Sequence, residues 1–203
     1  MAARQDIIVV GASAGAVETL PTLAASLPYD LPATLFVVVH TQPRRQSHLP
    51  EILNHAGRVP ARHAVDGEAI ECGRIYVAPP DRHLVVKPGH VRLSAGPAEK
   101  HHRPAIDVTF HSAAIAYGPR VAGVILTGQM DDGTAGLREI QRRGGVTIVQ
   151  DPDEAFFPSM PRNALRAGSA DYTVRLPELA ALLVKLSRPD GTDDQDADFR
   201  AAS

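Results

Sequence analysis

The sequence predicts a doubly wound α/β protein: a mainly parallel sheet with helices on both faces and an antiparallel hairpin. Short apolar runs rich in β-branched residues alternate with segments whose apolar residues recur at helical spacing. Most of the short runs are apolar throughout, as strands of a parallel sheet covered by helices must be. Two strand-like arms around Pro88-Gly89, within residues 83–94, predict the hairpin, which we place as an antiparallel excursion on the parallel sheet.

Each predicted strand is a short apolar run that ends in a glycine, a histidine or a polar residue. The runs are IIVV, TLFVVV, IYV, VAGVILT and VTIV, at residues 7–10, 34–39, 75–77, 121–127 and 146–149. Helical spacing of apolar residues predicts helices at residues 17–27, 47–56, 107–117, 134–143 and 177–186. Asp107 is the expected N-cap of the third helix. Strands that alternate with helices in this way predict a parallel sheet.

Residues 1–188 are predicted to form one domain, and the polar, acidic stretch 189–203 is predicted to be a disordered tail. The formal net charge of −2 gives no reason to expect a nucleic-acid partner. The longest apolar runs are far shorter than the ~20 residues of a membrane-spanning helix, so no membrane insertion is expected. The single cysteine, Cys72, cannot form an internal disulfide, and no signal peptide is visible, so we expect a cytoplasmic protein.

The first chemical motif is Gly11-Ala12-Ser13-Ala14-Gly15, between a buried strand and a helix. This G-x-S-x-G pattern in a strand–turn–helix context is typical of a nucleophile elbow, which makes Ser13 the candidate nucleophile. Glycine-rich turns after a first strand also bind the pyrophosphate of dinucleotides, and the motif alone leaves both interpretations open. The absence of an acidic residue at the end of the second strand, and of a Tyr-x-x-x-Lys pair, favours the hydrolase.

His40 and the pair Asp131 and Asp132 complete the candidate site. His40 directly follows the second buried strand, and the two aspartates lie in a glycine-rich loop after the strand at 121–127. The carboxyl ends of the strands in an open α/β sheet share one edge, where ligands bind. We therefore predict a Ser-His-Asp triad, with the alternative that Asp-Gly here supplies only turn and cap chemistry. His101 and His102 are interpreted as a loop pair beside Arg103.

Six segments in this order resemble the catalytic domain of the CheB family of chemotaxis protein-glutamate methylesterases. They are GASAGA after IIVV, the strand that ends in His40, GRIYVAPPDRHL at 73–84, RPAIDVTFHSAA at 103–114, VILTGQMDDGTAGL at 124–137 and PSMPRNAL at 158–165. The resemblance covers residues 5–186, so that residues 1–188 would be the catalytic domain.

The resemblance implies hydrolysis of glutamate γ-methyl esters on the cytoplasmic helices of chemoreceptors, and in some members deamidation of glutamines. It places the nucleophile on Ser13, the base on His40 and the acid on Asp132, with backbone N–H groups of Ala14 and Gln129 as the oxyanion hole. It implies no cofactor and no metal. The alternatives are a dinucleotide-dependent oxidoreductase, a serine esterase with a substrate outside chemotaxis, and a catalytically silent binding module.

The sequence departs from the family pattern next to the predicted chemistry. Ala14 replaces a threonine, Ala16 a glycine and Gln129 a methionine, and Thr41 follows His40 where the family usually has Met-Pro. A backbone oxyanion donor survives these changes, so we expect them to affect the choice of substrate. Only a few residues precede the first predicted strand, which leaves no room for the receiver domain of many members. We therefore expect activity without phosphorylation in cis, or control by a separate regulatory protein.

Overall fold

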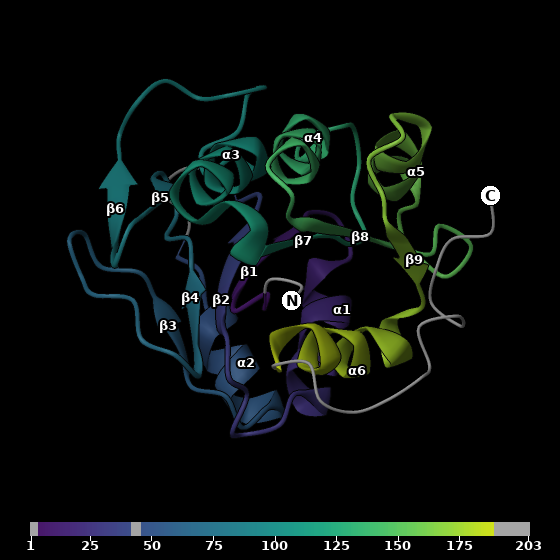
Figure 1. Cartoon of the computed structure of the whole chain (residues 1–203). Coiled ribbons are helices and arrows are strands. Elements are labelled where there is room, and N and C mark those ends of the chain that lie inside the picture. The colour runs from purple at the N-terminus through teal and green to yellow at the C-terminus, as the bar shows by residue number, and fades with distance from the viewer. Residues whose placement is uncertain (1–3, 42–45, 189–203) are drawn as a thin grey trace.

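The computed structural model describes residues 4–41 and 46–188 and places a seven-stranded parallel sheet at the centre of the molecule (Figure 1). The strand order is β3-β4-β2-β1-β7-β8-β9, and every neighbouring pair is parallel. The strands are β1 (Ile7–Ala12), β2 (Thr34–Val39), β3 (Ala61–His63), β4 (Arg74–Val77), β7 (Val121–Ile125), β8 (Val146–Gln150) and β9 (Tyr172–Val174). The predicted fold class is confirmed.

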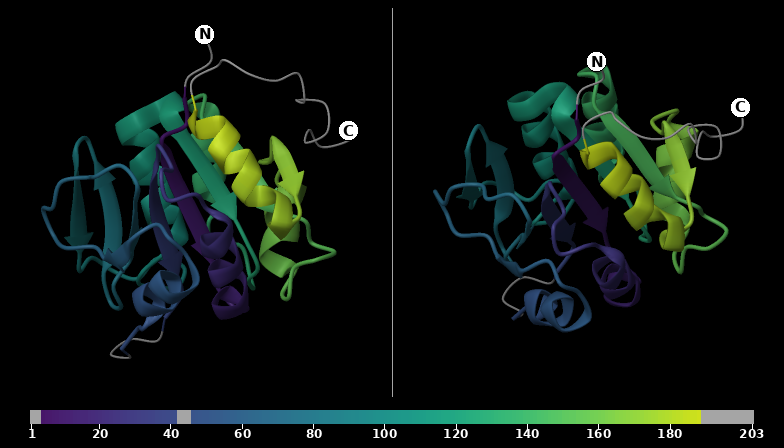
Figure 2. Two further views of the ribbon diagram at one scale, coloured as in Figure 1. Left: turned by 90° about the horizontal axis from the view of Figure 1, so that it is seen from below. Right: turned by 60° about the horizontal axis from the view of Figure 1, so that its bottom comes forward.

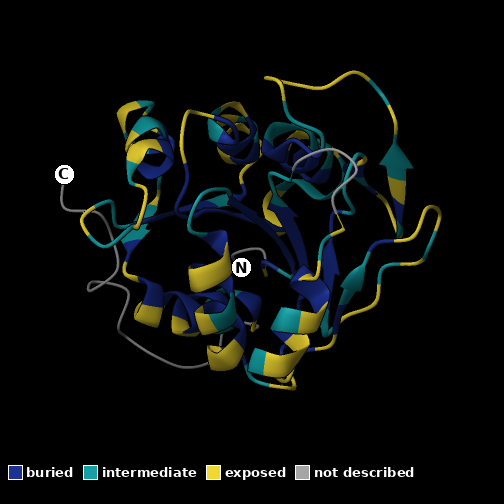
Figure 3. Cartoon of the chain, turned by 180° about the vertical axis from the view of Figure 1, so that it is seen from behind, coloured by how far each residue is buried: buried dark blue, intermediate teal, exposed yellow. Residues whose placement is uncertain are grey.

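Helices cover both faces of the sheet (Figure 1). One face carries α1 (Ala16–Ser26), α2 (Leu49–Ala56) and α6 (Leu176–Ser187), and the other carries α3 (Ile106–Tyr117), α4 (Thr134–Arg142) and α5 (Ser159–Arg166). Alternation along β1 shows why: Ile8 and Val10 pack into the first core, and Ile7 and Val9 pack into the second. Figure 3 shows the central strands of the sheet buried and the outer faces of the helices exposed.

Three short elements escaped the sequence prediction: β3, α5 and β9. A one-turn 3₁₀-helix, η1 (Gly118–Arg120), also precedes β7. Strands of three residues are too short to show a period, and their pairing with β4 and β8 comes from tertiary context. The strand predicted at 121–127 ends at Ile125, and the remaining two residues begin the loop that leads to Asp132.

The predicted hairpin forms, but it is not part of the parallel sheet. Strands β5 (His83–Lys87) and β6 (His90–Ser94) make a separate two-stranded antiparallel sheet beside α3. Buried Leu84, Val86 and Val91 pack into the same core as Phe110 of α3. Burial of one face of the hairpin against a helix therefore replaces pairing with the parallel sheet.

The carboxyl ends of the parallel strands converge on one edge of the sheet (Figure 2). At its centre, β1 lies between β2 and β7, so the chain runs from β1 to one side first and returns later to the other. This is the switch point in strand order where open α/β sheets bind ligands. Among the described residues, no helix is long and apolar enough to cross a membrane. The tail predicted at 189–203 lies outside the described residues.

Candidate active site

Ser13 occupies a sharp turn between β1 and α1. Gly15 has a φ of 81°, in the left-handed region, and a Cβ built on it would lie 2.9 Å from the Thr127 hydroxyl oxygen. The Ser13 N–H donates to the carbonyl of Thr127 at 3.0 Å, which fixes the turn against the loop after β7. Glycine is therefore required two residues after the candidate nucleophile, as the motif indicated.

His40 follows β2 and joins the other two candidate residues. Its Nδ1 lies 3.0 Å from the Ser13 Oγ, and its Nε2 lies 2.7 Å from Asp132 Oδ2. The side chains of His40 and Asp132 are 7% and 1% exposed, so water competes little for these bonds. The structure thus brings Ser13, His40 and Asp132 together from the ends of three adjacent strands.

Asp132 is held by the N-terminus of α3. The N–H of Ile106 donates to Asp132 Oδ2 at 2.7 Å, and the N–H of Asp107 donates to Oδ1 at 3.1 Å. Asp132 therefore caps α3 from a distant loop, and the prediction that Asp107 is the N-cap is wrong. Asp107 lies in the first turn, where its Oδ1 accepts from the N–H of Gly136 at 2.7 Å.

These bonds set the protonation states of the site. Burial alone would raise the pKa of Asp132, but hydrogen bonds from His40, Ile106 and Asp107 lower it to about 2. An ionised carboxylate only accepts hydrogen bonds, so the Nε2 of neutral His40 carries the proton. Nδ1 is then free to accept the proton of the Ser13 hydroxyl, which is the arrangement that activates a serine nucleophile.

The predicted oxyanion donors lie beside Ser13. Within residues 4–41 and 46–188, the N–H groups of Ala14 and Gln129 have no hydrogen-bond acceptor. Gly128, next to Gln129, approaches Ser13 so closely that an added Cβ would lie 3.1 Å from the serine Cβ. One of these donors belongs to the residue after Ser13, and the other to the residue after Gly128, so both remain candidates for the oxyanion hole.

The PSMP motif supports the loop that contains Gln129. The carbonyl of Phe157 accepts from the N–H of Gly128 at 2.9 Å, and the N–H of Met160 donates to the carbonyl of Gly128 at 3.0 Å. Asn163 in α5 donates to the carbonyl of Met130 at 2.7 Å. The segment that the sequence analysis identified only as a motif therefore fixes one side of the site.

A cleft of about 470 Å³ opens beside Ser13 and His40. Its lining includes Val17, Thr41, His48 and Ile52, so α1 and α2 form its other walls. Thr41 and Ala16 both line this cleft. Among the described residues, no group of three or more His, Cys, Asp or Glu side chains could hold a metal ion.

Sequence analysis missed His102, whose ring stacks on His40. The ring centroids are 3.6 Å apart and the planes differ by 4°. Burial, and then the charge of His40, lower the pKa of His102, which favours the neutral form of this ring. The one available signal was its position directly before the segment RPAIDVTFHSAA.

The doubly wound fold and the bonded Ser13, His40 and Asp132 define the class of serine hydrolases. In chain order the residues run Ser, His, Asp, whereas α/β-hydrolases run Ser, Asp, His, so this is a different lineage within that class. Residues 8–183 match the CheB methylesterase family, and the chain belongs to that family. The resemblance drawn from the six segments is confirmed.

Curated relatives and a crystal structure agree with this assignment. The chain is 38% identical over 196 residues to protein-glutamate methylesterase/protein-glutamine glutaminase 5 of Anaeromyxobacter dehalogenans, covering 91% of this chain and 52% of the relative. It is 36% identical over 184 residues to a putative enzyme of the same name from Leptospira interrogans, covering 90% and 95%. The catalytic domain of Thermotoga maritima CheB methylesterase superposes with a TM-score of 0.86 at 30% identity, covering 92% and 100%.

The relatives differ in length. The chain spans about half the length of several curated relatives, such as the Anaeromyxobacter protein, and nearly all of the Leptospira protein. The family match at residues 8–183 includes Ser13, His40 and Asp132.

The buried charge of Asp132 should be visible in the pH dependence of stability. Because the folded-state pKa of about 2 lies below the unfolded value, Asp132 stabilises the fold above pH ~4, and this contribution is lost as the pH falls toward ~2. We expect Asp132→Asn to lower the free energy of unfolding at pH 7 by on the order of 2 kcal/mol. Urea unfolding of both proteins from pH 7 downward should show the difference shrinking below pH ~4; a constant difference would contradict this account.

The stacked ring of His102 should restrict the orientation of His40. We expect His102→Ala to slow the reaction of Ser13 with a serine-directed phosphonate by roughly three- to tenfold, because the His40 ring loses the stacked ring that restricts its orientation. His102→Phe retains a flat ring and should recover most of the rate. Equal losses in the two variants would show that the imidazole nitrogens matter, and not the stack.

Proposed function

We propose that this protein hydrolyses the γ-methyl esters of glutamate side chains on the cytoplasmic helices of chemoreceptors, and deamidates glutamine side chains there by the same route. The main support for this function is the continuous set of hydrogen bonds from Ser13 through His40 to Asp132 in a member of the CheB methylesterase family. The names of the relatives support the two reactions. A receptor helix on the cytoplasmic side requires a cytoplasmic enzyme.

In the first half-reaction, Ser13 attacks the ester carbonyl. Its Oγ bonds to the carbonyl carbon while His40 Nδ1 takes the hydroxyl proton, and Asp132 stabilises the imidazolium through Nε2. The N–H groups of Ala14 and Gln129 hold the resulting oxyanion. When the intermediate collapses, the methoxy group leaves with the proton from His40 as methanol, and a glutamyl ester of Ser13 remains.

In the second half-reaction, water hydrolyses the glutamyl ester of Ser13. His40 takes one proton from the water as its oxygen attacks the acyl carbon, and the same oxyanion site stabilises the second tetrahedral intermediate. The Ser13 oxygen then leaves with the proton from His40, which regenerates the enzyme and releases a glutamate carboxylate. With a glutamine side chain the leaving group of the first half-reaction is ammonia, and the second is unchanged.

An apolar rim around Ser13 supports a macromolecular substrate. The side chains of Val17, Met130, Phe156 and Phe157 are 60%, 54%, 64% and 40% exposed. Val17 lines the Ser13 cleft, Phe156 lies against the turn at Gly15, and Phe157 hydrogen-bonds to the loop after β7. Apolar side chains gathered around a reactive group mark an interaction surface, and an amphipathic helix has the chemistry to cover it.

Release of methanol tests the proposed reaction directly. Purified protein incubated with methylated receptor fragments should release methanol, and Ser13→Ala should lower the rate by a factor of at least ~10³ because the nucleophile is lost. Asp132→Asn should be far more damaging than Asp131→Asn, since only Asp132 contacts His40. If no methylated receptor yields methanol while Ser13 still reacts with a phosphonate, the protein is a hydrolase of another substrate.

The apolar rim predicts a defect that depends on the size of the substrate. Phe156→Ser should raise KM for a methylated receptor fragment by roughly three- to tenfold because an exposed aromatic contact is lost, and leave hydrolysis of a small methyl ester unchanged. Tyr29→Ser is the matched control, because Tyr29 is 72% exposed in the loop before β2, at the opposite edge of the sheet. Equal effects of Phe156→Ser on the two substrates would contradict a role of the apolar rim in binding the receptor fragment.

A further inference from the structure

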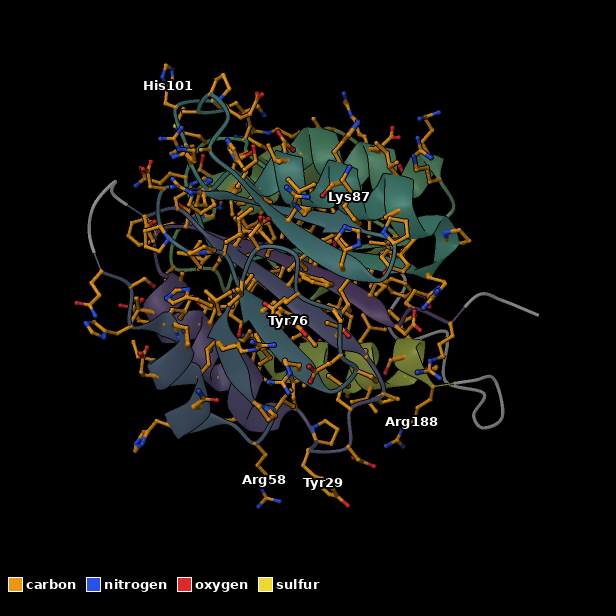
Figure 4. All side chains as sticks on the ribbon, turned by 90° about the vertical axis from the view of Figure 1, so that its left-hand side faces the viewer. Tyr29, Arg58, Tyr76, Lys87, His101 and Arg188 are labelled. Carbon is orange, nitrogen blue, oxygen red and sulfur yellow. The ribbon has the colours of Figure 1, made fainter. Side chains whose placement is uncertain are left out.

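A tight turn brings His102 to the active site. The N–H of Glu99 donates to the carbonyl of His102 at 3.0 Å, and the N–H of His102 donates to the carbonyl of Glu99 at 2.8 Å. The two residues between them, Lys100 and His101, have φ values of 47° and 70°. Residues with a Cβ adopt this left-handed conformation only when surrounding contacts compensate. His101 projects outward at the tip of the turn (Figure 4), so the compensating contacts must come from elsewhere in the turn.

The side chain of Lys100 supplies such contacts. Its Nζ lies 3.0 Å from Asp107 Oδ2 and 3.2 Å from Asp131 Oδ2, and it donates to the carbonyl of Asp131 at 3.2 Å. Partial burial alone would lower the pKa of Lys100, but the two carboxylates raise it, so the ammonium stays charged at neutral pH. One cation therefore joins the turn at 99–102, the first turn of α3 and the loop before Asp132.

Each of these three segments provides one contact of the proposed active site. The turn carries His102, whose ring stacks on His40. The first turn of α3 supplies the N–H groups that bind Asp132. The third segment contains Gln129 and Asp132 on either side of Met130, which also has a left-handed backbone with a φ of 66°. Two loops with unfavourable backbone conformations are thus fastened to each other and to a helix by a single ammonium group.

We propose that Lys100 is a positioning residue of this active site: its ammonium group holds the loop of Gln129 and Asp132 in register with the turn that places His102 on His40. The identity of the reaction rests on the proposed function, whereas the positioning role concerns the reactivity of Ser13 with any acylating or phosphonylating reagent.

The exposure of the ion pairs of Lys100 distinguishes a positioning role, which affects the reaction rate, from a role in stabilising the fold. Lys100 and Asp131 are 35% and 56% exposed, and an ion pair at such a position contributes little to stability. Asp107 is 17% exposed, so its pair with Lys100 is the one that contributes more to stability, and the melting temperature measures that contribution separately from the rate. Reaction rates are more sensitive than stability, because a small displacement of a reacting or orienting group can cost a large factor in rate. Loss of the ammonium group should therefore slow the chemistry while the fold remains intact.

The test compares Lys100→Met, Lys100→Arg and Lys87→Met. The readouts are the rate constant for phosphonylation of Ser13, kcat and KM for a small methyl ester, and the melting temperature. Lys100→Met should lower the phosphonylation rate and kcat by roughly five- to twentyfold with KM changed by less than about twofold. Lys100→Arg keeps a cation and should recover most of the loss. Lys87, at the end of β5, lies apart from the turn (Figure 4), so Lys87→Met controls for net charge.

Two results would overturn the proposal. One is a phosphonylation rate in Lys100→Met within about twofold of the wild-type rate, and the other is an equal loss in Lys87→Met. A wild-type protein that reacts with the phosphonate and releases no methanol would contradict the proposed substrate and leave this comparison valid.

A double-mutant cycle locates the partner of the ammonium group. If Lys100 acts through Asp131, then Asp131→Asn and Lys100→Met should each slow phosphonylation, and the double variant should be little slower than Lys100→Met alone. Fully additive losses would show that the two side chains act independently and would contradict a positioning role of Lys100 through Asp131.

Discussion

The active site depends on one interaction, the binding of the Asp132 carboxylate by the N-terminus of α3. The first N–H groups of a helix lack partners within the helix, and they carry the positive end of its dipole. Ile106 and Asp107 direct these groups at Asp132, which in turn holds the Nε2 proton of His40. Without that helix end, a carboxylate that is 1% exposed would keep only the hydrogen bond from His40 to stabilise its charge. The tautomer of His40, and hence the acceptor for the Ser13 proton, follows from this contact.

Strand order makes the contact possible. Because β1 lies between β2 and β7, the three residues that follow these strands meet at one edge although they are far apart in the sequence. The close approach of α3 to β1 needs Gly11, where an added Cβ would lie 2.4 Å from the Ile106 side chain. Gly11 therefore allows α3 to pack close to the sheet, which brings the helix end within hydrogen-bond distance of Asp132.

The sequence predicts site residues that follow buried strands better than site residues that lie in irregular loops. Ser13, His40 and Asp132 each follow an apolar run, and parallel strands bring their carboxyl ends to a shared edge. His102 and Lys100 lie in a segment with no hydrophobic period, and their positions depend on a turn with two positive φ values that no glycine or asparagine marked. Asp107 satisfied the local rule for an N-cap, but a more distant carboxylate fills that place, which no window of adjacent residues can reveal.

The site is consequently divided between rigid and adjustable parts. The positions of Ser13 and His40 are set by β1 and β2, whose side chains are almost fully buried, so substitutions in these strands change the free energy of unfolding. The segments around Gln129, Met130 and His102 are exposed or half-buried and are fixed by a few hydrogen bonds and ion pairs. Such loops can vary without loss of the core. His102 in these loops stacks on His40, and Gln129 carries a proposed oxyanion donor, so we expect variation in these loops to act on the rate of the reaction.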